Sequence, residues 1–218
     1  MNRAMWLPPL AVLLAVSAVA AHPSAPVERP RIVAFGDSLT SGRGIGQAQA
    51  FPAILQRRLD DQGFDFSVVN AGVSGDTSSR AMRRFDAALD GDVRVLILAL
   101  GANDGLRGAA VAQLRSNLSR MIETAQARGI TVLLCGMEAL PIYGWDYTVA
   151  FHNAYRDLAR QYGVTLVPFV LMNVIGNKDL MQADHAHPNA DGARAIADNI
   201  WPYLEPILRK RAAPPVAR

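Results

Sequence analysis

Five short apolar runs alternate with longer amphipathic segments between residues 31 and 208. This alternation is typical of successive strand–helix units whose helices cover a parallel sheet. Two of the runs are almost wholly apolar, as strands buried on both faces should be. The predicted strands cover residues 31–35, 66–70, 93–100, 130–136 and 164–169. The sequence therefore predicts an α/β fold built on a five-stranded parallel sheet.

Helical spacing of apolar residues fills the intervals between these strands. The predicted helices cover residues 50–63, 111–129, 150–163 and 189–209, and a weaker pattern covers 77–89. Pro202 predicts a kink or break in the last helix. No repeat or linker interrupts the pattern, and half of the 218 residues are apolar, so we expect one globular domain from 29 to 208. Residues 209–218 are then predicted to be a disordered basic tail.

The N-terminal segment differs from the rest of the chain. Arg3 is followed by an apolar stretch from Leu7 to Val19. The small-residue pattern Ala18-Val19-Ala20 overlaps the end of this stretch. This pattern is typical of a secretory signal peptide, which we place at residues 1–21. We therefore expect a periplasmic or secreted protein with no stable membrane anchor after cleavage. An uncleaved N-terminal anchor is the alternative.

Charge and cysteine content restrict the remaining possibilities. The net charge is only +3, and no basic helix with interleaved aromatic residues accompanies it, so we expect no nucleic-acid partner. Cys135 is the single cysteine and lies in an apolar predicted strand. An intramolecular disulfide is excluded, and Cys135 is predicted to be a buried core residue. The oligomeric state cannot be predicted from these features.

Polar, glycine-rich segments follow several of the predicted strands. Because parallel strands end at one edge of a sheet, functional groups in such folds gather there. The segments are "GDSLTSGRG", "NAGVSGDTSS", "GANDGLRG" and a longer stretch that contains "DHAH". They bring Ser38, Asn103, Asp184 and His187 to the same edge. Asp37, beside Ser38, is expected to brace the turn rather than to titrate.

Two of the four histidines are candidates for a catalytic base. His185 and His187 precede the last predicted helix, and Asp184 lies three residues before His187. That spacing lets a carboxylate on a tight turn accept the Nδ1 proton of the imidazole and leaves Nε2 free. A metal site built on "DHAH" is an alternative, although the other loops offer few further ligands. Nucleophilic catalysis by Ser38 is the favoured interpretation.

These segments together resemble the sequence blocks of the SGNH hydrolase superfamily, the GDSL-type esterases. The matching stretches are "FGDSLT", "NAGVSGDTS", "GANDGLRG" and "DHAHPNADG". They fall within about residues 31 to 205, almost all of the chain beyond the predicted signal peptide. The resemblance implies a three-layer α/β/α sandwich of flavodoxin-like topology. The branch that the chain resembles most contains periplasmic arylesterases, lysophospholipases and acyl-CoA thioesterase I.

The resemblance also implies a role for each matching residue. Ser38 would be the nucleophile, His187 the general base and Asp184 the group that orients it. The backbone N–H groups of Ser38 and Gly75 and the side-chain amide of Asn103 would form the oxyanion hole. The implied reaction is hydrolysis of an ester or thioester through an acyl-enzyme, with no metal or organic cofactor.

The loops after Asn103 and after the fourth strand are expected to form the wall of an acyl pocket, because they carry apolar residues close to the predicted site. The wall candidates are Leu106, Leu140, Ile142 and Tyr143. The expected partner is a small acyl ester or thioester. A carbohydrate deacetylase of the same fold and a non-catalytic binding protein are the alternatives.

Overall fold

The computed structural model describes residues 29–212 and contains one parallel sheet. Its strands are β1 (Arg31–Gly36), β2 (Ser67–Gly72), β3 (Val93–Ala99), β4 (Thr131–Cys135) and β5 (Thr165–Val167). They lie in the order β2-β1-β3-β4-β5, and every neighbouring pair is parallel. The predicted five-stranded parallel sheet is confirmed.

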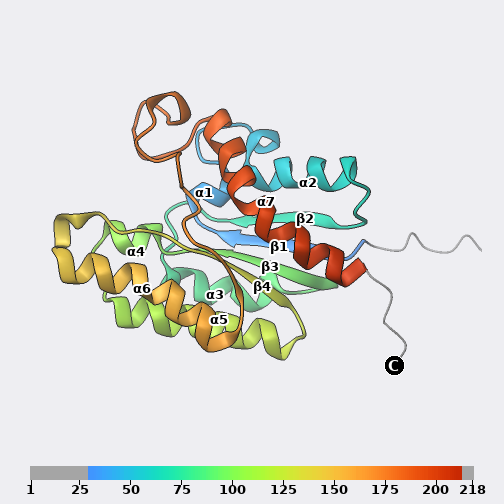
Figure 1. Cartoon of the computed structure of the whole chain (residues 1–218), viewed down its shortest axis with the longest axis horizontal. Helices are drawn as coiled ribbons and strands as arrows, with labels where there is room; N and C mark the ends of the chain where they lie inside the picture. The colour runs from blue at the N-terminus through green and yellow to red at the C-terminus, as the bar shows by residue number, and fades with distance from the viewer. Residues whose placement is uncertain (1–28, 213–218) are drawn as a thin grey trace, which may run out of the picture.

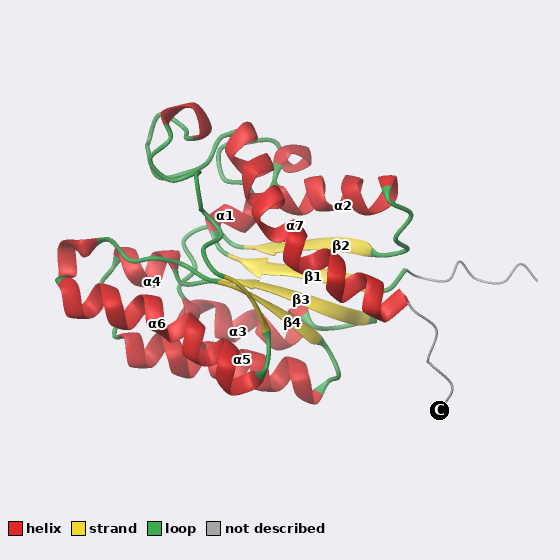
Figure 2. Ribbon diagram, in the orientation of Figure 1, coloured by secondary structure: helices red, strands yellow, loops and turns green. Residues whose placement is uncertain are grey.

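Helices cover both faces of this sheet (Figures 1 and 2). The α-helices are α1 (Ser38–Ser41), α2 (Phe51–Asp61), α3 (Ser78–Ala88), α4 (Ala102–Leu106), α5 (Val111–Ala127), α6 (Trp145–Tyr162) and α7 (Ala190–Ala212). Short 3-10 helices are η1 (Gln47–Gln49), η2 (Pro141–Tyr143) and η3 (Lys178–Leu180). Helices α2 and α7 pack together on one face, whereas α3, α5 and α6 pack on the other. The result is the expected three-layer sandwich.

The central strands form the core. Each residue of β1 from Ile32 to Gly36 is buried, and so is each residue of β4 after Thr131. Phe35 of β1 meets Phe85 of α3 edge to face, with 5.1 Å between ring centroids. Cys135 is buried as predicted, and burial raises the pKa of its thiol to about 12, so it remains a neutral apolar group.

The last helix differs from the prediction. It continues to Ala212, so residues 209–212 belong to α7 and not to the predicted tail. Arg211 anchors this end by donating to the hydroxyl of Thr131 and the carbonyl of Gly129. Pro202 does not break α7, because it lies on the exposed side, where the carbonyl that loses its helical partner can bind water.

Two predictions fall on the ends of the chain. The signal peptide at residues 1–21 and the tail beyond residue 212 lie outside the described residues. Among residues 29–212 there is no helix that is both long enough and apolar enough to span a bilayer.

Strand register brings the polar segments to one edge. Gly36 at the end of β1 is level with Gly72 of β2 and with Ala99 of β3. Helices α1 and α4 begin just beyond β1 and β3, and both lie at the same end of the sheet in Figure 1. The segments that carry Ser38, Gly75 and Asn103 therefore leave the sheet side by side.

Candidate active site

Ser38 is the first residue of α1, directly after β1. The Asp37 side chain caps this helix, since its Oδ1 accepts the Leu39 N–H at 3.0 Å. The helix has only four residues and ends at Gly42, whose φ of 73° is left-handed. This short, capped helix holds the Ser38 side chain at the sheet edge with only 9% of the residue exposed.

His187 contacts Ser38 from the loop between η3 and α7. Its Nε2 lies 3.1 Å from Ser38 Oγ, and its Nδ1 lies 2.7 Å from Asp184 Oδ2. The other Asp184 oxygen accepts the N–H groups of Ala186 and His187, both at 3.0 Å. The hydrogen bond to the His187 imidazole has the largest effect on the pKa of Asp184. Together with the two backbone bonds, it holds this pKa well below its usual range. An ionised Asp184 selects the tautomer in which Nδ1 carries the proton and Nε2 can accept one from Ser38.

The rival histidine, His185, has no hydrogen bond to Ser38. His185 is exposed and has a left-handed φ of 53°, a conformation that histidine adopts more readily than most residues. Within residues 29–212 its only hydrogen bond runs from its backbone N–H to the Gln182 carbonyl, at 3.0 Å. Of the two candidate bases, His187 is the one whose imidazole contacts Ser38.

Gly75 and Asn103 belong to the segments that follow β2 and β3, next to the segment of Ser38. Gly75 follows β2 with a φ of 81°, and a β-carbon at that position would meet no atom within 4 Å. Asn103 Nδ2 donates to the carbonyl of Asp76 at 3.0 Å and to Asp37 Oδ2 at 3.3 Å. The Asn103 amide therefore contacts the residue after Gly75 and the residue before Ser38.

Two of the predicted oxyanion donors are backbone amides. Within residues 29–212, neither the Ser38 N–H nor the Gly75 N–H has a hydrogen-bond acceptor. Unsatisfied N–H groups beside a nucleophile can receive a negatively charged oxygen. The structure thus brings the three predicted donors to adjoining segments at the edge of the sheet.

Asp37 is a buried carboxylate between the nucleophile and the amide. It is fully buried, and burial raises its pKa from 3.8 to about 6. The hydrogen bonds from Leu39 and Asn103 act in the opposite direction, because they favour the charged form. Asp37 braces the turn as expected. The expectation that it does not titrate was wrong, because burial moves its pKa toward neutrality.

The chain is similar to a known protein family and to several named proteins. The model of the GDSL-like Lipase/Acylhydrolase family matches residues 34–195. Esterase TesA of Pseudomonas aeruginosa is 43% identical over 178 residues, which cover 81% of this chain and 89% of that protein. The protein named Thioesterase 1/protease 1/lysophospholipase L1 of Escherichia coli is 34% identical, over 81% of this chain and 84% of its own.

The chain belongs to the GDSL-like lipase/acylhydrolase family. The crystal structure of TesA has the same fold, with a TM-score of 0.78 and 42% identity over 81% of this chain and 99% of that one. The resemblance to SGNH hydrolases is thereby confirmed, and so is the prediction of an esterase. The names of these relatives imply small esters as substrates.

The four acyl-wall candidates of this GDSL-family chain are all exposed, with 55% of Leu106, 48% of Leu140, 68% of Ile142 and 44% of Tyr143 accessible. Tyr143 connects η2 to α4, because its hydroxyl donates to the Leu106 carbonyl at 3.0 Å. A cavity of about 450 Å³ opens next to α1, but its lining does not include any of the four. They form an open apolar surface beside α4, and their role as an acyl wall remains a prediction.

Sequence reasoning did not identify several residues that support the GDSL-family site. Gln182 donates to the carbonyls of Arg43 and Pro188, at 2.7 and 2.8 Å, and so ties the loop after α1 to the loop of His187. Asp104, buried beside Asn103, accepts from the backbone and the hydroxyl of Ser78. No local pattern marks either residue, because Arg43 lies 139 residues from Gln182 and Ser78 lies 26 residues from Asp104.

Proposed function

We propose that this GDSL-family enzyme hydrolyses carboxylic esters or thioesters with Ser38 as the nucleophile. The chain of hydrogen bonds from Asp184 through His187 to Ser38 carries the proposal, at 2.7 and 3.1 Å. His187 Nε2 removes the proton of Ser38 as Oγ attacks the carbonyl carbon. The same nitrogen then protonates the departing alcohol or thiol, which leaves an acyl-enzyme.

The oxyanion of each tetrahedral intermediate binds between the N–H groups of Ser38 and Gly75 and the Asn103 amide. Three donors from three segments surround an oxygen that carries charge only after attack, so they stabilise the transition state more than the substrate. In the second half of the reaction, His187 accepts a proton from water, which attacks the acyl carbon. The bond from that carbon to Ser38 Oγ then breaks, His187 returns the proton to Oγ, and the carboxylic acid leaves. Aryl esters, lysophospholipids and acyl thioesters fit this chemistry. Relatives named arylesterase, lysophospholipase and thioesterase support these classes.

The test is hydrolysis of p-nitrophenyl esters of increasing acyl length. Ser38→Ala and His187→Ala should each lower kcat by at least about 1000-fold, because the nucleophile and its base act as a unit. His185→Ala is the matched control and should stay within about twofold of wild type, since its imidazole has no contact with Ser38. Wild-type activity in Ser38→Ala would overturn the proposal. A strict preference for acetyl would favour a carbohydrate deacetylase instead.

The proposal includes export, with residues 1–21 as a cleaved signal peptide and action in the periplasm or outside the cell. Its support is the sequence pattern of an early arginine, an apolar stretch and small residues. Expression of the full chain in a Gram-negative host, followed by fractionation and mass measurement, tests it. A soluble periplasmic product that begins near residue 21 or 22 is expected. An intact Met1 in the membrane fraction would indicate an uncleaved anchor.

A further inference from the structure

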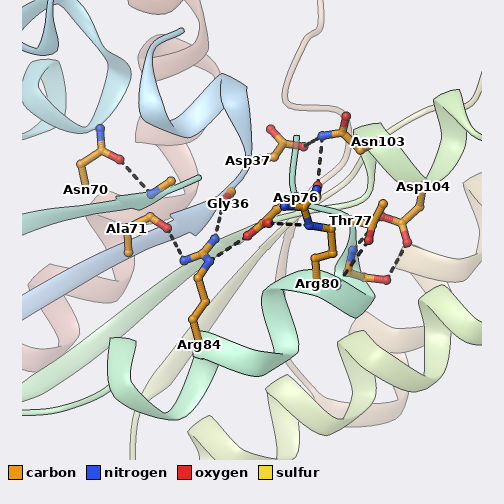
Figure 3. Close-up of polar contacts among 12 residues, drawn as sticks. Gly36, Asp37, Asn70, Ala71, Asp76, Thr77, Arg80, Arg84, Asn103 and Asp104 are labelled. Atoms are coloured by element: carbon orange, nitrogen blue, oxygen red, sulfur yellow. Dashed lines mark hydrogen bonds and ion pairs between the residues drawn. The ribbon is translucent and has the colours of Figure 1, made fainter. Parts of the chain in front are cut away.

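Arg84 of α3 joins three segments of the chain at the edge of the sheet (Figure 3). Its three guanidinium nitrogens each donate one bond of 2.8 Å. Nε donates to Asp76 Oδ2, one terminal nitrogen to the Ala71 carbonyl and the other to the Gly36 carbonyl. These acceptors are the end of β2, the end of β1 and the carboxylate that follows Gly75.

Each predicted oxyanion donor is connected to one of the residues that Arg84 binds. Two donors are near such a residue in sequence, and the third is hydrogen-bonded to one. The Ser38 N–H comes two residues after Gly36, and the Gly75 N–H comes immediately before Asp76. The Asn103 amide is bound to the carbonyl of Asp76 at 3.0 Å. One guanidinium therefore fixes the spacing of all the segments that supply donors.

We infer that Arg84 is a positioning residue for the oxyanion hole. The inference rests on the proposed function, because it assumes that Ser38, Gly75 and Asn103 bind the oxyanion. Arg84 itself touches no reacting atom; it acts by holding the peptide units next to those that do.

The surroundings favour arginine at this position. Asp76 is an almost fully buried carboxylate, with 5% of its side chain exposed, and it needs a charged partner. Arg84 is the closer of its two cations, at 2.8 Å, whereas the more exposed Arg80 lies 3.7 Å from the other carboxylate oxygen. The Arg84 guanidinium also lies over the ring of Phe35, with its Cζ 4.1 Å from the ring centroid. This cation–π contact helps to orient the guanidinium. Only a planar group with donors in three directions reaches the carboxylate and both carbonyls together. A lysine ammonium can neutralise Asp76 but lacks this fork.

The adjacent residue provides a matched control. Arg83 lies on the same helix, is exposed and makes no side-chain hydrogen bond or ion pair within residues 29–212. Arg83→Ala removes the same charge and volume from α3 without touching the site. The variants to compare with it are Arg84→Ala and Arg84→Lys, each made in the full chain.

The experiment measures kcat and KM for p-nitrophenyl butyrate and the inhibition constant of butylboronic acid. A boronate bound to Ser38 places a negatively charged oxygen where the oxyanion forms. Both Arg84 variants should lose about 10- to 100-fold in kcat, with KM within about threefold, because misplaced donors weaken only transition-state binding. The inhibition constant should rise in proportion to the loss of kcat/KM. A merely structural role would not produce that proportionality.

Several outcomes would overturn the inference. One is a kcat for Arg84→Lys that lies within about twofold of the kcat for Arg83→Ala. If Arg84→Ala does not fold, the result for Arg84→Lys decides by itself. Another is a lower kcat with an unchanged boronate inhibition constant. Ser38→Ala in the same assay tests the proposed function separately from the role of Arg84. If Ser38→Ala is active, the proposed function fails; if it is inactive while the Arg84 variants match the control, only the role of Arg84 fails.

Discussion

Replacing Asp37 with asparagine should change how the stability of the protein depends on pH. Asp37 is fully buried, and its pKa is about 6 in the folded protein compared with 3.8 for an ordinary aspartate. The folded state therefore holds the Asp37 proton more tightly than the unfolded state does. The stabilisation is fully present below about pH 3.8 and is lost as the pH rises through about 6. Asp37→Asn has no proton to lose there.

The size of the effect follows from the shift in pKa. A difference of about 2 pH units corresponds to about 3 kcal/mol over the whole range, at about 1.4 kcal/mol per unit. Between about pH 4.5 and 7.5, the two titration curves give a loss of about 2 kcal/mol from this carboxyl group. Because Asp37 has no exposed surface, solvent screening does not reduce this figure much.

Urea unfolding of wild type and Asp37→Asn at several pH values within this range measures the difference in their free energies of unfolding. The variant should become about 2 kcal/mol more stable relative to wild type as the pH rises, whatever the constant offset between them. Asp61→Asn, at an exposed position of α2, is the control and should show no such trend. A difference between wild type and Asp37→Asn that does not vary with pH would refute the reasoning.

Three further changes test other parts of the site. Gly75→Ala should lower the free energy of unfolding by about 1 kcal/mol in urea, because φ is 81° although the space around the position is open. Ser78→Ala should cost about 1 to 3 kcal/mol in the same assay, because the buried hydroxyl donates to Asp104 at 2.6 Å and accepts from Asn117 at 2.9 Å. Ile142→Ser should leave stability unchanged, since 68% of the residue is exposed. If Ile142 contacts the acyl chain, that variant should lower the octanoate-to-butyrate ratio of kcat/KM by about fivefold, and an unchanged ratio would remove it from the acyl wall.

The strands and the site edge could be predicted because their signals are local. Runs such as residues 93–100 are apolar for as long as the strand is buried, and β3 matches this run to within one residue. Parallel strands share one edge, so Ser38 and Asn103 could be placed together without knowing the order of the strands. The resemblance in sequence then added the roles of Gly75 and His187.

The remaining features depend on contacts between distant parts of the chain. The end of α7 was placed three residues too early, because residues 210–212 have no apolar pattern. The end of the helix is held by the contact of Arg211 with Thr131, 80 residues away in sequence. The raised pKa of Asp37 is caused by burial, which only the packed fold creates. Neither property can be inferred from neighbouring residues.

Arg84 illustrates the same limit at the site itself. In the sequence it is one of three arginines on a short helix, beside Arg80 and Arg83, and nothing local distinguishes it from them. In the structure its partners are 8, 13 and 48 residues away, and they come from three different segments. Two of them are backbone carbonyls, which every residue type carries and which therefore leave no trace in the sequence. Residues that touch substrate can be found by their chemistry, whereas those that position them become apparent only once the acceptors are located in space.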